Sequence, residues 1–380
     1  MITFADPHFR AASGVMRRSV WRIRERTEIL KTAQRIQDGD PDSWTREWLE
    51  AAATYQDQGQ IRAGDEQLDR DRAAAACYAA ALALASHDLD DDRRRRVLAR
   101  YNACWERILR ASGGRRIAMV GTSTPTEVVF FRAADQQPGQ SRPTVIVLPG
   151  AAGMSSETWG TIGAAAEERG FHWAVVEGAM SLSPSRTVSA VVDAIRALPE
   201  VDADCLVAVG IDEGGWTIAA SLASEHRLAA AVLAPAVIDL STPSISALSL
   251  HAREALFSGD RDGFEREIHL AEVLSPDVAK LTRRQAEILR LESSTRYDQF
   301  RAVRSTRSEI TGRDIQTPVL IVDDGEHPWK EQPWDFHSEV ESSDYVAVCA
   351  DRWPEEEDRI LNWIETHVQG NQPTSKVSAD

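Results

Sequence analysis

The segment Val207–Ala223, VAVGIDEGGWTIAASLA, decides the fold. It begins as an apolar run, turns through three glycines that surround Asp212, and continues as a helix of small residues. A short apolar run bounded by glycine is typical of a buried strand, and glycines allow a strand and a helix to approach closely. The segment therefore predicts a tight strand-to-helix turn that carries a carboxylate.

Strand-like and helix-like segments alternate on both sides of this turn. Helices are predicted at 156–168, at 187–198, from residue 214, and at 355–367. The apolar runs are RIAMVG (116–121), TEVVFFRA (126–133), TVIVLPG (144–150), HWAVVEG (172–178), CLVAVG (205–210), AAAVLAPAV (229–237), TPVLIVDDG (317–325) and DYVAVCA (344–350). This alternation predicts an α/β fold with a mostly parallel sheet covered by helices on both faces.

Two regions depart from the alternation. Residues 13–111 lack strand-like runs and contain four segments with helical periodicity, and the region between Asp239 and Arg313 reads as several helices. We therefore predict five parts. These are a helical N-terminal lid domain (1–115), the first part of the α/β core (116–238), a helical cap insertion (239–311), the second part of the core (312–369) and a disordered polar tail (370–380).

Composition restricts the class of partner. The chain has 43 Lys and Arg against 59 Asp and Glu, a formal charge of −16, which disfavours nucleic acid and anionic membranes. No apolar run approaches the ~20 residues of a membrane span, and the N-terminus lacks a secretory pattern. We expect a cytoplasmic protein that acts on a small organic molecule without a cofactor; a homodimer is left open.

The cysteines have no metal-ligand spacing. They lie far apart in apolar surroundings, at Cys77, Cys104, Cys205 and Cys349. Free thiols at such positions behave as small buried hydrophobic groups. We therefore predict buried free cysteines and no metal site.

The turn, the alternation and the helical insertion together resemble the α/β-hydrolase superfamily, in which such a turn is the nucleophile elbow. The N-terminal helices, with Gly39-Asp-x-x-x-Trp44, a later Ala-rich helix containing Tyr78 and the helix 101–111, narrow the resemblance. They are similar to the subgroup of 2,6-dihydroxypseudooxynicotine hydrolase, fungal polyketide-shortening hydrolases and the fermentation-respiration switch protein. The resemblance covers most of the chain.

All three positions of the Ser-Asp-His triad that this resemblance implies are changed here. Asp212 occupies the serine position. After the next-to-last strand the sequence reads DDGEHP, so Glu326 or His327 occupies the acid position. After the last strand it reads ADRWP, where Arg352 replaces histidine. The resemblance also implies an oxyanion hole in LPGAAGM, formed by the backbone N–H of Ala151 or Ala152 and of Glu213.

A carboxylate at the elbow permits two chemistries. As a nucleophile, Asp212 would form an ester that a histidine-activated water must cleave, and histidine is missing at the last position unless His327 takes that role. As a general base or acid, it suits proton transfer beside a carbonyl, with the enolate held by backbone N–H groups. The second route leads to elimination, cyclisation or carbon–carbon cleavage without a covalent intermediate.

Each candidate also has a structural interpretation. Asp212 could cap the helix that follows it, His327 could be a surface turn residue before proline, and Arg352 could be a solvated loop residue. Tryptophans lie beside the three site segments, at Trp216, Trp329, Trp334 and Trp353. They are common core residues, but at these places they predict a flat apolar substrate pocket.

Three functions remain. The first is an α/β-hydrolase-fold enzyme with elimination, lyase-like or cyclising chemistry on a polyketide-like or aromatic natural-product intermediate. The second is a hydrolase that uses Asp212 as nucleophile on an ester, carbon–carbon or epoxide-type substrate. The third is a catalytically silent relative that serves as a scaffold or binding protein.

Overall fold

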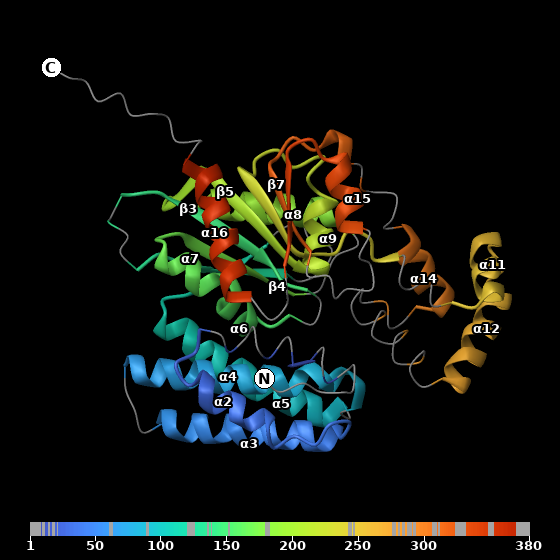
Figure 1. Ribbon diagram of the computed structural model, residues 1–380, viewed down its shortest axis with the longest axis horizontal. Helices are drawn as coiled ribbons and strands as arrows, with labels where there is room; N and C mark the ends of the chain where they lie inside the picture. The colour runs from blue at the N-terminus through green and yellow to red at the C-terminus, as the bar shows by residue number, and fades with distance from the viewer. Residues whose placement is uncertain are drawn as a thin grey trace. The chain divides into compact units, whose positions relative to one another are not determined.

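The computed structural model of the chain is shown in Figure 1. The residues that it describes are 22–60, 64–88, 91–119, 126–134, 139–150, 153–178, 183–241, 248–275, 294–305, 312–323, 332–348 and 353–369, with single positions at 9, 12, 13, 16, 20, 137, 245, 279, 282, 286, 291 and 310. The tail 370–380 lies outside them.

The chain forms two compact units. The first, the helical unit, comprises Met1–Arg116, Val129–Arg132 and Ala152–Arg169. The second, the sheet unit, comprises Ile117–Val128, Ala133–Ala151 and Gly170–Asp380. The lid role of residues 1–115, and the division into five parts, stay predictions.

The helical unit is built around an alanine-rich helix. Its elements are α2 (Arg26–Ala33), α3 (Pro41–Gln60), α4 (Asp65–Asp88), α5 (Asp91–Ala111), α6 (Ser155–Thr158), the π-helix η1 (Trp159–Gly163) and α7 (Ala164–Glu168). The alanines at 73–76 and 79–81 of α4 are all buried. Alanine favours helix and has a small side chain, so α4 packs closely against both α3 and α5.

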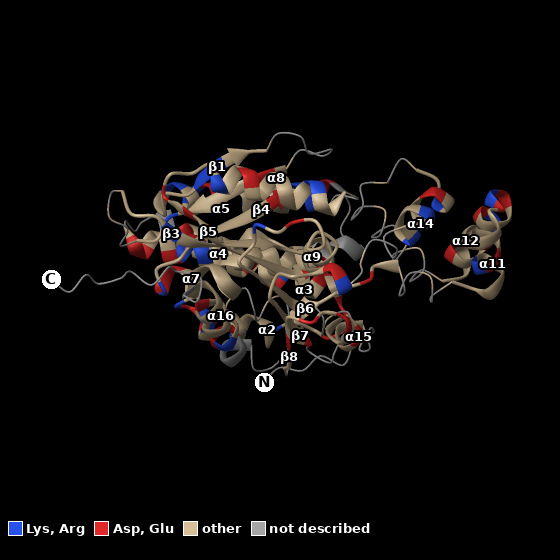
Figure 2. Cartoon of the chain, turned by 90° about the horizontal axis from the view of Figure 1, so that it is seen from above, with Lys and Arg blue, Asp and Glu red and all other residues tan. Residues whose placement is uncertain are grey.

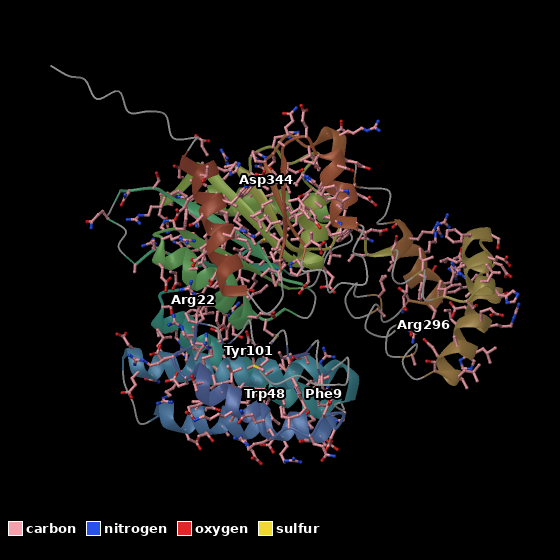
Figure 3. The ribbon with its side chains drawn as sticks, viewed as in Figure 1. Phe9, Arg22, Trp48, Tyr101, Arg296 and Asp344 are labelled. Carbon is pink, nitrogen blue, oxygen red and sulfur yellow. The ribbon has the colours of Figure 1, made fainter. Side chains whose placement is uncertain are left out.

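Aromatic side chains complete the core of these helices. The rings of Trp44 and Trp48 lie 5.9 Å apart, and Phe9 contacts Trp44 at 5.2 Å. Phe9 and Trp48 are labelled in Figure 3. The indole N–H of Trp44 donates to the carbonyl of Ala80 at 2.8 Å. Because α3 begins at Pro41, its first turn is capped by Asp40, whose Oδ1 accepts the backbone N–H of residues 42 and 43.

The predicted α/β sheet is confirmed. Its strands are β1 (Arg115–Ala118), β2 (Thr126–Phe131), β3 (Arg142–Leu148), β4 (His172–Gly178), β5 (Val201–Asp212), β6 (Ala230–Ala236), β7 (Val319–Asp323) and β8 (Ser343–Ala347). They are ordered β1-β2-β4-β3-β5-β6-β7-β8, and every pairing from β4 to β8 is parallel. The central strands are almost wholly buried, because apolar residues face helices on both sides.

Helices cover this sheet. They are α8 (Pro184–Arg196), α9 (Glu213–Ala219), α15 (Gln332–Glu339) and α16 (Trp353–Gln369). Figure 2 shows α8 and α16 on opposite sides of β3 and β5. A buried histidine, His172, links the segments after β2 and before β5. The backbone N–H of Ala133 donates to Nδ1 of His172 at 3.0 Å, so Nε2 of His172 carries the proton and donates to the carbonyl of Glu200 at 3.0 Å. His172 is thus a structural residue.

Within the segment predicted as the cap, helices α11 (Leu250–Ser258), α12 (Arg261–Leu274) and α14 (Arg296–Ser305) share a small core. Phe264 is fully buried there and contacts the ring of Phe300 at 5.3 Å. Arg296 pairs with Glu272 at 2.9 Å and links α14 to α12 (Figure 3). The 3-10 helix η3 (Gly312–Asp314) precedes the return to the sheet.

Two further observations concern the described residues only. No helix among them is both long and apolar enough to cross a membrane. Cys77, Cys104 and Cys205 are free and buried, and burial raises the pKa of each thiol. Cys349 lies outside the described residues.

Candidate active site

The turn between β5 and α9 has a strained backbone at Asp212. Its φ is 51° and its ψ is −122°, and among the described non-glycine residues it is the one with positive φ. Such a conformation costs about 1–3 kcal/mol and persists where the surroundings enforce it, most often at functional sites. The turn predicted from the sequence is therefore present and holds its carboxylate in an unusual position.

Two glycines make the turn possible. A Cβ at Gly210 would lie 2.6 Å from the Cα of Gly215, and a Cβ at Gly214 would lie 2.0 Å from the carbonyl oxygen of Leu148. Atoms cannot approach this closely without moving backbone. Residues 210–215, here called the elbow, thus pack directly on the end of β3.

The elbow lies at the carboxyl edge of the sheet, where the strand order reverses. β3 pairs with β4 on one side and β5 on the other, with Leu148 opposite Gly210. On its other side β5 pairs with β6, with Asp212 opposite Ala236. Ligands of open α/β sheets bind in the crevice outside such a reversal point. The location favours a site, independently of any motif.

The side chain of Asp212 does not cap the helix. Asp212 holds the N-cap position of α9 but makes no capping hydrogen bond. It is half-buried, as is the neighbouring Glu213. The geometry therefore does not support the interpretation of Asp212 as an ordinary helix cap.

The carboxylate of Glu213 reaches the loop after β3. A Cβ at Gly150 would lie 2.6 Å from Oε2 of Glu213 and 3.0 Å from the Cβ of Asp212. Sequence reasoning assigned Glu213 its backbone N–H alone, and the position of its carboxylate was missed. The signal was the glycine at 150, which leaves room for that carboxylate.

Trp216 lies one turn into α9 and is fully buried. Among the described residues its indole N–H has no hydrogen-bond partner. Its role in binding substrate stays a prediction.

The remaining predicted site residues have no described side chain. Six lie outside the described residues, and a seventh, Trp353, begins α16 without a described side chain. The six are Ala151, Ala152, Glu326, His327, Trp329 and Arg352. The strands that precede them, β7 and β8, are parallel neighbours that run to Asp323 and Ala347. The replacement of the triad at three positions therefore stays a prediction.

Two other carboxylates lie at or just after strand ends on the same edge, Asp323 as the last residue of β7 and Asp239 after β6. Asp323 accepts the hydroxyl of Tyr345 at 2.5 Å, and burial together with this carboxylate raises the pKa of Tyr345 to about 12. Asp239, after β6, accepts the backbone N–H of Ser241 at 2.7 Å and its hydroxyl at 2.6 Å. Its own N–H donates to the side-chain oxygen of Gln332. Both carboxylates hold local structure.

A hollow of about 400 Å³ is lined by residues of the helical unit. The guanidinium of Arg72 stacks on the ring of Trp159 at 4.1 Å. Arg22 pairs with Glu168 at 2.6 Å nearby. The lining of the hollow includes three arginines and three carboxylates. Its residues are Arg22, Ile23, Arg24, Asp69, Arg72, Trp159, Ala164, Glu167 and Glu168. Because these opposite charges balance, the lining favours neither an anionic nor a cationic ligand.

The described residues contain no group of three or more metal-ligating side chains.

Comparisons with known proteins identify the fold. No protein-family model matches the sequence, and no curated protein matches it. Among solved structures, 2,6-dihydroxy-pseudo-oxynicotine hydrolase is similar with a TM-score of 0.70 and 17% identity, over 94% of this chain and 96% of that one. AbyA5 is similar with a TM-score of 0.58 and 18% identity, over 90% and 92%. The chain has the α/β-hydrolase fold, as predicted.

Proposed function

We propose that the protein is an α/β-hydrolase-fold enzyme in which Asp212 transfers protons instead of attacking carbon. The reaction is an elimination, lyase-type cleavage or cyclisation of a polyketide-like or aromatic natural-product intermediate. The observation that carries this proposal is the strained backbone of Asp212, which presents a carboxylate without using it to cap α9.

The choice of base over nucleophile follows from what each route needs. An aspartyl ester must be cleaved by an activated water, and the sequence has Arg352 where the resemblance implies the activating histidine. Arginine is always protonated and cannot act as that base. Proton transfer needs no covalent intermediate, so it does not depend on the missing histidine.

The substrate class rests on charge and on the nearby aromatic residues. A chain with a formal charge of −16 repels polyanionic ligands. Tryptophans at 216, 329 and 353 adjoin the three site segments in sequence. Indole faces bind flat apolar molecules well, so we assign a small, flat substrate with a carbonyl group.

The alternative function is a hydrolase with Asp212 as nucleophile. The observation that favours it is the turn itself, because a strained strand-to-helix turn is how this fold exposes a nucleophile.

The variant Asp212→Asn tests the proposal, because it retains shape while removing the group that takes up a proton. In a screen of β-hydroxy, β-acyloxy and β-diketone aromatic compounds, kcat/KM should fall by ~10²–10⁴-fold with the fold retained. The matched control is Asp204→Asn, at an exposed position of the same strand. It should keep wild-type turnover.

Full activity of the Asn variant would overturn the proposal. A mass increase at Asp212 in intact-protein mass spectra after mixing with substrate would instead support the nucleophilic route.

A further inference from the structure

We propose that the hollow of the helical unit binds a small aliphatic α-amino acid in its zwitterionic form. Arg72 holds the carboxylate and Asp69 holds the ammonium group. The aliphatic side chain lies against Ile23 and Ala164. This inference goes beyond the proposed function, because the residues that line the hollow belong to the helical unit and the elbow belongs to the sheet unit.

The hollow has the size of a small-molecule site. Its volume of about 400 Å³ lies within the ~300–1,000 Å³ that is typical of ligand pockets. Its three arginines and three carboxylates balance, so a ligand without net charge suits it. A molecule that carries one positive and one negative group meets this condition and can bind both kinds of side chain.

Arg72 offers hydrogen-bond donors that the protein itself does not use. Its side chain is 17% exposed, and its contact with Asp69, at 4.0 Å, is longer than a hydrogen bond. Among the described residues, Nε of Arg72 has no hydrogen-bond partner. Burial lowers the pKa of Arg72, although nearby carboxylates oppose this effect. Because a guanidinium can donate two parallel hydrogen bonds to a carboxylate, such a group on the ligand would offset the cost of this burial.

The indole of Trp159 supports Arg72 from one side. The guanidinium carbon lies 4.1 Å from the centre of the indole ring, and a stacked guanidinium keeps the N–H groups at its edge available. Trp159 is 7% exposed, and its own N–H has no hydrogen-bond partner among the described residues. It also begins the π-helix η1, a distortion that is frequent at functional sites. The wall formed by these two residues is therefore rich in donors and suits an acceptor group.

Asp69 offers the acceptor that an ammonium group needs. It precedes Arg72 by three residues on α4, and both residues line the hollow. Its contacts with Arg24 at 3.6 Å and with Arg72 at 4.0 Å are both longer than a hydrogen bond. Arg22, in contrast, already donates to Glu168 at 2.6 Å. Since Asp69 and Arg72 lie side by side, they match the two charged groups that an α-amino acid carries on a single carbon.

The apolar part of the lining indicates the side chain of the ligand. Ile23 and Ala164 are the two aliphatic residues that line the hollow, and both are buried. Arg72 covers a face of the Trp159 ring, which restricts stacking of an aromatic ligand on it. An aliphatic side chain therefore fits this lining better than an aromatic or charged one.

The probe for this proposal is L-leucine, and binding is measured by titration calorimetry at neutral pH. We expect saturable binding with a dissociation constant below about 10 mM. Two analogues of similar shape each lack one charge: 4-methylpentanoate has no ammonium group, and 3-methylbutylamine has no carboxylate. Each should bind at least about tenfold more weakly than L-leucine, because it leaves Asp69 or Arg72 without the group that it holds.

Two variants test the residues themselves. Arg72→Gln removes the cation, and Asp69→Asn removes the anion while retaining shape; each should weaken binding of L-leucine by at least about tenfold. The matched control is Asp65→Asn, at an exposed position one turn earlier on α4 that does not line the hollow. It should bind within about twofold of wild type. Circular dichroism shows whether each variant is folded, and Asp69→Asn decides if Arg72→Gln is not.

Three results would overturn the site. They are no saturable binding of L-leucine up to about 10 mM, equal binding of L-leucine and either analogue, and unchanged binding by a folded Asp69→Asn variant. Because the test measures binding and not turnover, its outcome is separate from that of the proposed function. Asp212→Asn should bind L-leucine as wild type does, whether or not the elbow transfers protons.

Discussion

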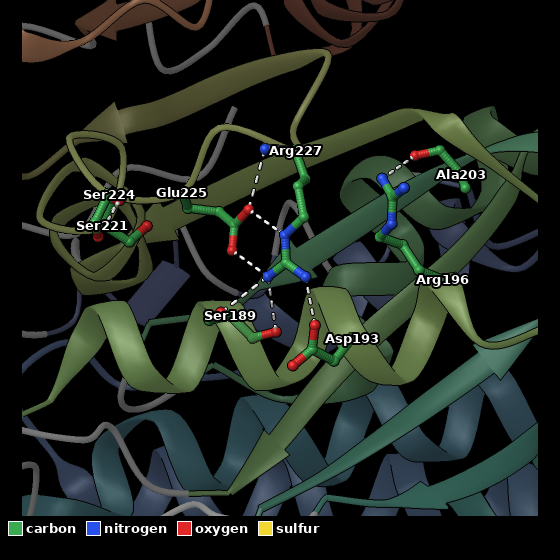
Figure 4. Close-up of polar contacts among 8 residues, drawn as sticks. All are labelled: Ser189, Asp193, Arg196, Ala203, Ser221, Ser224, Glu225 and Arg227. Atoms are coloured by element: carbon green, nitrogen blue, oxygen red, sulfur yellow. Dashed lines mark hydrogen bonds and ion pairs between the residues drawn. The ribbon is translucent and has the colours of Figure 1, made fainter.

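Two carboxylates flank α9, and the protein treats them differently. Asp212, at its start, has a strained backbone and no capping bond. Glu225, beyond its end, is 3% exposed and binds Arg227 through Nε at 2.8 Å and Nη2 at 2.6 Å (Figure 4). We propose a reactive role for the first, because its backbone is strained and its side chain does not cap α9, whereas the bonds from Arg227 make the second structural.

The Arg227 network shows what a structural carboxylate looks like in this chain. Arg227 also donates to Asp193 and, at 2.9 Å, to the hydroxyl of Ser189, which ties the segment after α9 to α8. Burial raises the pKa of Glu225, but the bonds from Arg227 outweigh burial and hold it below its usual value. A buried acid with such partners stays ionised and fixed.

Breaking the elbow should have the largest effect on stability. In Gly214→Ala the new methyl group would meet the backbone carbonyl of Leu148 at 2.0 Å, so the turn must open. We expect the free energy of unfolding to fall by more than about 3 kcal/mol, measured by urea denaturation. The matched control is Gly215→Ala, whose methyl would lie 3.4 Å from Val237, an ordinary contact. Equal stability of the two variants would contradict the packing described for the elbow.

Removing the partner of Glu225 comes next. Arg227→Ala leaves a buried carboxylate without its principal donor, which costs 3–5 kcal/mol in a fully buried pair. Because the Arg227 side chain is 37% exposed, we discount this to about 2 kcal/mol. Asp193→Asn, which removes an exposed acceptor of the same arginine, should cost about 0.5 kcal/mol or less.

The pair of Glu225 and Arg227 should also make the stability of the fold depend on pH. Because its pKa is lowered in the folded state, Glu225 stabilises the fold at pH values above 4.5, its pKa in the unfolded chain. This stability is lost as the pH falls through the lower pKa of the folded state. In Arg227→Ala no bond from Arg227 offsets the burial of Glu225, so the pKa of Glu225 in the folded state should rise above 4.5. The Glu225 contribution then reverses and disfavours folding above that value. The gap between the urea midpoints of wild type and variant should therefore be larger at pH 7 than at pH 4.5.

A third carboxylate sharpens the contrast. Tyr345→Phe removes the hydroxyl that Asp323 accepts, and we expect a loss of about 1 kcal/mol, as for a typical hydrogen bond. Ultraviolet titration should also show that the variant lacks one of the tyrosines that ionise near pH 12 in the wild type. Since Asp323 serves structure here, turnover should not change; a large loss of turnover would place Asp323 with the reactive carboxylates.

The fold was predictable because its signals are local. Each of the eight apolar runs became a strand, and the glycine-rich turn became the elbow. β5 begins at Val201, four residues before the predicted start at Cys205, because the acidic residues 202 and 204 hide the strand pattern. The position of Glu213 depended on a contact with Gly150, 63 residues away in sequence, which no periodicity encodes.

Oxygen-18 labelling separates proton transfer from covalent catalysis at Asp212. The enzyme, in excess over substrate, completes a single turnover in H₂¹⁸O, and the peptide containing Asp212 is then analysed by mass spectrometry. Hydrolysis of an aspartyl ester by attack at its carbonyl leaves ¹⁸O in the Asp212 carboxylate, whereas a general base exchanges only protons. We expect no ¹⁸O at Asp212. Incorporation of one ¹⁸O atom there would show that Asp212 is a nucleophile and that the enzyme is a hydrolase.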